Sequence, residues 1–269
     1  MSDDDYVLGT QSEEIARLGL QHRVWRRRML DGWHRAGLRP GQCVVDVGAG
    51  PGFAAMDLAE IVGPDGRVVA LERSRGFLAA LAGRAATLGL TNIEARCTDV
   101  AAEPFGEGFA DMAWCRWVLS FVADPARTVD HIARALKAGG IAIFHEYADY
   151  AAWRTLPPSA DQERFRDLVM RSWRDSGGEP DSALALPGQL AQAGLELVSA
   201  RPLIDIVSRR DFEWEWPAAF MAVNATRLHA LGYATPGEAE AFAGALDALP
   251  DGALTITPLV AEMVARKPG

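Results

Sequence analysis

Residues 43–53 read Cys43-Val44-Val45-Asp46-Val47-Gly48-Ala49-Gly50-Pro51-Gly52-Phe53. The apolar run from Val44 to Val47 is interrupted only by Asp46 and predicts a short buried strand. Three glycines follow at alternate positions, and a run with helical character, residues 53–62, ends at Gly63-Pro64. A strand, a glycine turn and a helix in this order predict a loop that binds a ligand.

The glycine turn suits an anionic or nucleotide-like ligand for two reasons. Glycine adopts positive φ without strain and lets a ligand approach the backbone closely. The helix that follows presents free N–H groups and the positive end of its dipole. The spacing is G-x-G-x-G, however, and bulky Phe53 stands where the dinucleotide fingerprint has its third glycine. This departure argues against a nicotinamide dinucleotide.

Alternating strands and helices continue after this loop. Strands are predicted at 68–71, 93–97, 109–115 and 141–144. Ser74 is the expected cap of the helix that Gly89 ends, and Asp124-Pro125 begins a helix that Gly139-Gly140 ends. Four such alternations predict a parallel, doubly wound sheet.

The remaining segments are mostly helical. Helices are expected at about 12–36, 160–175, 187–193 and 217–231, and Thr235-Pro236-Gly237-Glu238 has the pattern of a capping box. Residues 195–207 and 254–264 look like strands, the first with a kink at Pro202. We therefore expect a helical leader at 1–40, a ligand-binding core at 41–150, helical caps at 151–194 and 211–250, and further core strands at 195–210 and 251–269.

Two stretches resemble a known family. The glycine-rich segment resembles the first motif of class I S-adenosylmethionine-dependent methyltransferases. Residues 6–25 resemble the leader of the small-molecule, ubiquinone/menaquinone type. The resemblance implies an α/β fold: a doubly wound, mostly parallel seven-stranded Rossmann-like sheet with an antiparallel last strand, an N-terminal helix and helical cap insertions. The cofactor that it implies is S-adenosyl-L-methionine.

Composition excludes several other classes. The 269 residues are 49% hydrophobic and 23% charged, which is typical of a soluble globular protein with a sizeable core. A net charge of −9 argues against a general surface for binding nucleic acid. The acidic start is unlike a signal peptide, and no apolar run approaches the roughly 20 residues of a membrane span. We expect a cytoplasmic protein with no membrane partner, a monomer or a homodimer.

The three cysteines are Cys43, Cys97 and Cys115, in or beside predicted strands. The number is odd and no C-x-x-C occurs, so we expect buried free thiols and no metal.

Acids at strand ends are the main binding candidates, because ligands of open parallel sheets bind beyond the carboxyl ends of the strands. Glu72 ends the second strand, 20 positions after Gly52, and is suited to accept two hydrogen bonds from a ribose diol; the alternative is a solvated turn acid. Asp99 follows the third strand, and the resemblance assigns it, with the next residue Val100, to the adenine; the alternative is a turn cap. Asp46 is a buried acid that either receives the cofactor's amino group or orients the glycine loop.

The leader helix supplies further candidates. The resemblance places Tyr6, Gln11 and Gln21 near the methionine end of the cofactor, whereas Trp25 is expected to pack on the sheet. The other expected cofactor residues are Gly48, Ala49, Gly50, Gly52, Arg73 and Arg116.

His145, at the end of the fifth strand, is the candidate general base, because imidazole titrates near neutrality. A structural histidine is the alternative, and Tyr147 shares its face in a strand of period two. Four tryptophans outside the core sheet either wall an apolar substrate pocket or form the core of the cap: Trp153, Trp173, Trp214 and Trp216.

The expected activity is therefore methyl transfer from S-adenosyl-L-methionine to an O, N or C atom of a small, apolar or aromatic metabolite. Displacement at a sulfonium carbon needs alignment and exclusion of water, and no nucleophilic side chain. Two alternatives stay open: an NAD(P)-dependent oxidoreductase, and a non-methylating cofactor-binding member of the same fold.

Overall fold

The computed structural model describes residues 12–269. Its larger sheet has seven strands in the order β3-β2-β1-β4-β5-β10-β7. Strands β1 to β5 are parallel to one another, and β10 is antiparallel to both β5 and β7. The bounds are β1 Cys43–Val47, β2 Arg67–Glu72, β3 Ile93–Cys97, β4 Ala110–Arg116, β5 Leu136–Asp149, β7 Glu196–Leu203 and β10 Leu259–Arg266. This is the expected doubly wound sheet with an antiparallel last strand.

Helices cover both faces of this sheet. Side chains from the second half of α1 and from α2 and α3 pack on one face, and those of α4 and α6 pack on the other. The even residues of β1 face the first layer and the odd residues face the second, as the two-residue period of a strand requires. The bounds are α1 Ser12–Arg35, α2 Phe53–Val62, α3 Arg75–Leu88, α4 Pro125–Ala135 and α6 Leu186–Gln192.

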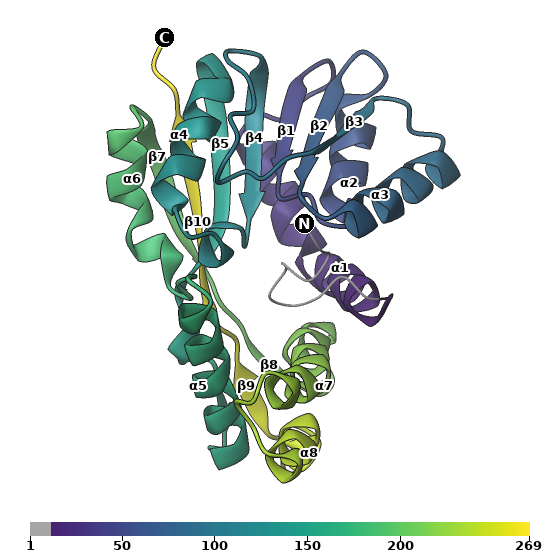
Figure 1. Cartoon of the computed structure of the whole chain (residues 1–269), viewed down its shortest axis with the longest axis vertical. Coiled ribbons are helices and arrows are strands. Elements are labelled where there is room, and N and C mark those ends of the chain that lie inside the picture. The colour runs from purple at the N-terminus through teal and green to yellow at the C-terminus, as the bar shows by residue number, and fades with distance from the viewer. Residues whose placement is uncertain (1–11) are drawn as a thin grey trace.

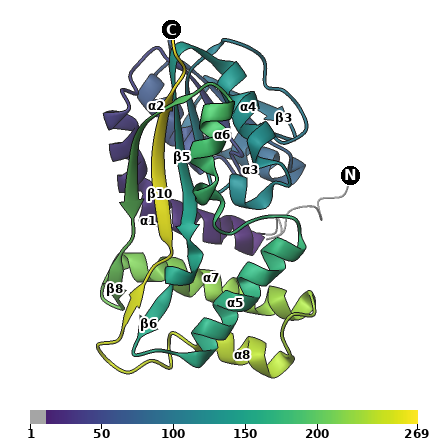
Figure 2. The same ribbon diagram turned by 90° about the vertical axis from the view of Figure 1, so that its left-hand side faces the viewer.

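A second tier lies at the carboxyl ends of the parallel strands (Figure 1). It contains α5 Ala160–Asp175, α7 Glu215–Ala230 and α8 Pro236–Gly244, with α1 running between it and the sheet in both views (Figures 1 and 2). A small antiparallel sheet in the order β6-β9-β8 supports these helices, with β6 Arg154–Leu156, β8 Ile206–Ser208 and β9 Leu254–Ile256. Aromatic and aliphatic side chains fill the space between the tiers.

Local signals in the sequence give several element ends correctly. The Ser74 hydroxyl accepts a hydrogen bond from Phe77 N–H at 3.2 Å, and Asp124 caps α4 with proline at its first turn. The capping box at Thr235 and Glu238 is present in full. Each of these caps acts on N–H groups two or three residues away, so the sequence alone can predict it.

Three expectations about the elements are wrong. Gly139 and Gly140 do not end α4, which stops at Ala135; they lie inside β5 as an irregularity, with Gly139 at φ 76°. The runs 254–264 and 195–207 each form two strands that belong to different sheets. In the run 195–207 the break lies after Leu203 and not at Pro202. Residues 186–194 and their helix α6 flank the main sheet, so they are no part of a cap.

Two further findings concern the described residues. No helix within residues 12–269 combines the length and apolarity that a membrane span requires. All three cysteines are free, and no cluster of three or more potential metal ligands occurs in the same range. Only Cys115 is buried; Cys97 is exposed and Cys43 intermediate, because the last positions of an edge strand and the first of β1 reach the surface.

Candidate active site

A cavity opens where the parallel strands end, between the main sheet, α1 and the second tier. Its empty volume, including space open to solvent, is about 1200 Å³. Four of the predicted strand-end groups meet here: the glycine loop, Glu72, Asp99 and Arg116.

The glycine loop has the backbone conformation that its composition predicts. Gly48, Gly50 and Gly52 have φ of 68°, 54° and 84°, values that side-chain-bearing residues rarely adopt. Gly48 lies directly under Val118, since a methyl group added at Gly48 would stand 2.4 Å from a Val118 methyl. Gly52 caps α2 and faces Leu81, so its role is structural and it is absent from the cavity lining.

Glu72 holds the glycine loop as well as facing the cavity. Its Oε2 accepts from Gly50 N–H at 2.9 Å, and its Oε1 accepts from Ser74 N–H at 2.8 Å. Burial raises the pKa of this carboxyl, whereas the two N–H bonds lower it. A carboxylate has about four acceptor positions, so both oxygens can still accept from a ligand.

Asp99 is both a turn cap and a cavity residue. Its Oδ1 accepts from Ala101 N–H at 3.0 Å, which is the capping role given above as the alternative. Within residues 12–269 its Oδ2 has no hydrogen-bond partner, and Asp99 and Val100 both line the cavity. The two interpretations are therefore compatible.

Asp46 and Arg116 carry opposite charges near each other without forming an ion pair; Asp46 is buried and Arg116 is partly buried. Asp46 is 2% exposed, and its Oδ2 has no hydrogen-bond partner among residues 12–269. Burial raises the pKa of Asp46 to about 7, although the nearby positive charge of Arg116 lowers it. Burial also lowers the pKa of Arg116 to about 10. No carboxylate of the described residues lies within ion-pair distance of Arg116. Because unpaired buried charge is costly, both side chains are suited to a zwitterionic ligand.

The leader helix brings Gln21 into the same cavity. Its Oε1 accepts from Arg17 Nη1 at 2.9 Å and from Trp216 Nε1 at 3.2 Å, which settles the orientation of the amide. The Nε2 group is then the one left to donate to a ligand. Tyr6 and Gln11, the other two leader candidates, lie outside the described residues.

Aromatic side chains wall the part of the cavity away from the strand-end acids. They come from four elements, and they are Trp117, Phe121, Tyr147, Trp173 and Phe220. Only some of them were candidates from the sequence. Trp173 is the one tryptophan of the four outside the core sheet that lines the cavity. The other three are buried in the apolar core of the second tier. Trp117 is indicated by its place directly after the fourth strand, whereas nothing in the sequence marks Phe220.

His145 does not lie where the general-base prediction requires. Its side chain is fully buried, its Nε2 lies 3.1 Å from Glu262 Oε2, and it is not among the cavity-lining residues. Burial lowers its pKa. The ring centroids of Trp114 and Trp25 lie 4.7 and 6.1 Å from that of His145, so the structure places His145 in the packed interior, as the structural alternative describes, and away from the cavity.

Comparisons with known proteins agree with this geometry. A family model described as "Methyltransferase domain" matches residues 45–144. A ubiquinone/menaquinone biosynthesis C-methyltransferase of Cupriavidus taiwanensis is 26% identical over 162 residues, which are 60% of this chain and 64% of that protein. A demethylmenaquinone methyltransferase of Lactococcus lactis is 31% identical over 120 residues, 45% of this chain and 46% of that one. The chain thus matches less than two thirds of the length of these curated relatives.

A solved structure shows the same fold over most of the chain. It is a putative methyltransferase from Bacillus halodurans, with a TM-score of 0.60 and 18% identity, covering 89% of this chain and 98% of that one. S-Adenosylmethionine is the cofactor of the family that the sequence resembles, and the glycine cradle and the unpartnered Asp46 oxygen fit it. Residues 45–144 therefore form a methyltransferase domain, in a chain that has the class I S-adenosylmethionine-dependent methyltransferase fold and resembles the ubiquinone/menaquinone type.

Proposed function

We propose that this protein transfers a methyl group from S-adenosyl-L-methionine to an O, N or C atom of a small, apolar or aromatic metabolite. One observation carries the proposal: the glycine loop and two strand-end acids line one end of a single cavity, whose other end is walled by aromatic rings. The first set suits an adenosine, and the second suits a flat or apolar acceptor.

The cofactor would lie across the strand ends. Glu72 would accept from the ribose hydroxyls, and Asp99 Oδ2 would accept from the adenine amine next to Val100. At the methionine end, the free Oδ2 of Asp46 would accept from the ammonium group. Arg116 or the Gln21 Nε2 group would donate to the carboxylate. Bound there, the cofactor supplies an activated methyl group on a sulfonium.

The acceptor would lie between the aromatic walls. Trp117, Tyr147 and Trp173 are nearly buried, so an apolar molecule between them would displace water and be held against the methyl group. Among the described residues that line the cavity there is no histidine. The protein's contribution is then alignment and exclusion of water, with the nucleophile supplied by the acceptor.

The alternatives are weighed by the same observations. Phe53 lies under Arg84, whose guanidinium is 3.9 Å from the ring centroid, and against Gly19 of α1, so the position of the third dinucleotide glycine is filled by packing. None of the comparisons supports an oxidoreductase. A non-methylating member stays possible, because the structure of the [4+2]-cyclase SpnF has the same fold, with a TM-score of 0.55 at 22% identity, covering 90% of this chain and 80% of that one.

The test has two stages. Isothermal titration with S-adenosylhomocysteine and with NAD⁺ should show binding of the first alone; lack of binding at millimolar S-adenosylhomocysteine would reject the cofactor assignment. Mass spectrometry should then detect methylated product and S-adenosylhomocysteine in equal amounts with a panel of phenols, quinols and aromatic amines. Tight cofactor binding with no methylated product over a broad panel would favour the non-methylating alternative.

A further inference from the structure

Glu146 is a fully buried acid that the proposed chemistry does not use. It lies in β5 and points to the opposite face from Tyr147. Its Oε1 accepts from the backbone N–H groups of Val118 and Leu119 at 2.9 and 3.0 Å. Its Oε2 accepts from the hydroxyl of Ser120 at 3.3 Å. One carboxylate thus holds three successive residues of the loop that follows β4.

This loop contributes four residues to the cavity lining: Trp117, Val118, Phe121 and Val122. Trp117 has φ 52°, the only positive φ of a non-glycine residue in the described part of the chain. Such a conformation costs about 1–3 kcal/mol and persists only where the surroundings impose it. Trp117 N–H still donates to His145 C=O at 2.9 Å, so the turn that leaves the sheet begins at Trp117 itself. The next two N–H groups are those that Glu146 accepts.

The strained turn decides where the Trp117 ring stands. The ring stacks nearly parallel with the rings of Tyr147 and Trp216, at centroid distances of 5.5 and 5.7 Å. Its edge meets Trp25 of α1 at 5.0 Å. Trp117 therefore joins β5, α7 and α1 at the aromatic end of the cavity.

The same carboxylate also reaches the segment after α5. The Ser182 hydroxyl lies 3.3 Å from Glu146 Oε2 and 3.0 Å from the Ser120 hydroxyl. Beside it, Glu179 N–H donates to Ser120 C=O at 3.1 Å, and a methyl group added at Gly178 would stand only 2.3 Å from that oxygen. The end of α5, which carries Trp173, is therefore joined to the β4 loop.

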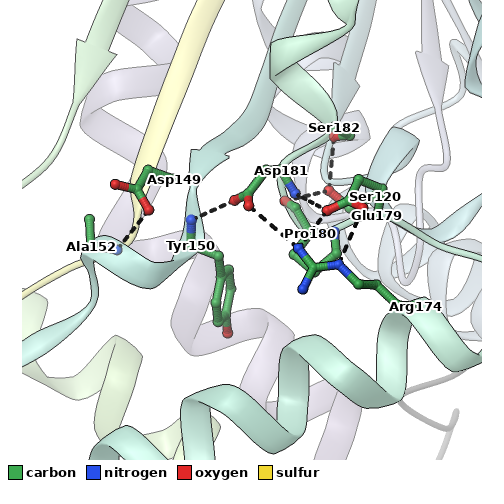
Figure 3. Close-up of polar contacts among 9 residues, drawn as sticks. All are labelled: Ser120, Asp149, Tyr150, Ala152, Arg174, Glu179, Pro180, Asp181 and Ser182. Atoms are coloured by element: carbon green, nitrogen blue, oxygen red, sulfur yellow. Dashed lines mark hydrogen bonds and ion pairs between the residues drawn. The ribbon is translucent and has the colours of Figure 1, made fainter.

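Outer contacts brace this junction (Figure 3). Asp181 Oδ1 accepts from Tyr150 N–H at 2.7 Å, and Arg174 donates to Glu179 at 2.9 Å. Figure 3 shows Asp181 between Tyr150 and Arg174, with Ser120 and Ser182 to the right of Asp181. The segment 174–182 thus connects the end of β5, α5 and the β4 loop.

We infer that Glu146 is a positioning residue, which holds Trp117 in its strained conformation and thereby sets the aromatic wall of the cavity. The assignment of that wall to the acceptor rests on the proposed function. The geometric claim about Trp117 does not, and it can be tested without any ligand.

Glutamine is the informative substitution. Its carbonyl oxygen can accept from Val118 and Leu119, and its amide can donate to the two serine hydroxyls, which then act as acceptors. Burial raises the pKa of Glu146 to about 7, so the loop is not held by charge alone. Glu146→Ala, by contrast, leaves two backbone donors unpaired.

The experiment uses near-ultraviolet circular dichroism, since stacked indole rings give a characteristic signal. Trp117→Phe identifies the Trp117 band. Glu146→Gln should keep that band and Glu146→Ala should lose most of it. The matched control is Asp111→Asn at the other end of β4, where the carboxylate accepts from Cys43 N–H at 2.8 Å and from Lys137 at 2.7 Å, and this variant should keep the band.

Two outcomes overturn the inference: a folded Glu146→Ala protein with the full Trp117 band, or a Glu146→Gln protein without it. The second applies even where Glu146→Ala fails to fold. Titration with S-adenosylhomocysteine is done in parallel on the wild type. Its failure there would reject the proposed function and leave the Glu146 result standing.

Discussion

Replacing Glu72 with glutamine tests the centre of the proposed cofactor site. The carboxylate oxygens each accept one backbone N–H, from Gly50 and from Ser74. That leaves one acceptor position on each oxygen, as many as a ribose diol has hydroxyl donors. Glutamine turns one oxygen into a donor. In either orientation its NH₂ group then faces a backbone N–H, and one ribose hydroxyl loses its acceptor.

The size of the effect follows from the loss of hydrogen bonds to a charged group. Such a bond contributes about 1.5–3 kcal/mol. The Kd for S-adenosylhomocysteine should therefore rise about 10- to 150-fold in Glu72→Gln. Burial raises the pKa of Glu72, so the titration is best done at mildly alkaline pH, which favours the carboxylate form. Calorimetry gives Kd directly.

The control is an acid one strand further out. Glu94 in β3 pairs with Arg96 at 2.7 Å and with Arg67 at 3.5 Å and does not line the cavity, so Glu94→Gln should bind as the wild type does. A melting curve without ligand separates loss of the Gly50 and Ser74 bonds from loss of binding. A folded Glu72→Gln protein with wild-type affinity would refute the ribose assignment.

Three further predictions concern buried positions. Because burial raises the pKa of Asp46 to about 7, the folded protein holds the carboxyl proton of Asp46 more tightly than the unfolded chain does. The free energy of unfolding should therefore fall by up to about 4 kcal/mol between acid pH and pH 8. In urea unfolding, Asp46→Asn should remove that part of the pH dependence, and it should also weaken S-adenosylhomocysteine binding. A variant less stable than the wild type at pH 8 would contradict this expectation. Gly52→Ala should lower the free energy of unfolding by at least about 1–3 kcal/mol, since φ is 84° and the methyl would meet Leu81 at 2.5 Å; Gly83→Ala, with open space around it, is the control. His145→Gln should lower the melting temperature and leave S-adenosylhomocysteine affinity unchanged, and altered affinity in a folded variant would return His145 to the site.

Patterns within a few residues of one another predicted the end of the cavity that we propose binds the cofactor. The run from Val44 to Phe53 forms its strand, turn and helix because apolar periodicity, glycine φ values and helix capping are local properties. Glu72 and Asp99 lie near the glycine loop because β2 pairs in parallel with β1 and β3 pairs in parallel with β2, so the carboxyl ends of all three strands share one edge.

Long-range pairing was beyond these patterns. Each strand of the small sheet has three residues, and Arg154 pairs with Ile256 about one hundred positions away. So short a run carries no periodicity, and its partner is found only by folding. The same holds for Gly139 and Gly140, which look like a helix stop but lie in β5, where Gly139 N–H bonds Lys267 C=O.

The two-residue period of a strand predicted that His145 and Tyr147 share one face of β5, but it did not predict how deeply each side chain is buried. Trp25 from α1 and Glu262 from β10 cover the histidine, while Tyr147, two residues nearer the strand end, reaches the cavity. By itself, then, the sequence determined the fold, the glycine cradle and the acids beside it, since these depend on neighbours along the chain. Only the tertiary structure decided which aromatic rings form the opposite wall and that the histidine is excluded, because both depend on how α1, α5 and α7 pack over the strand ends.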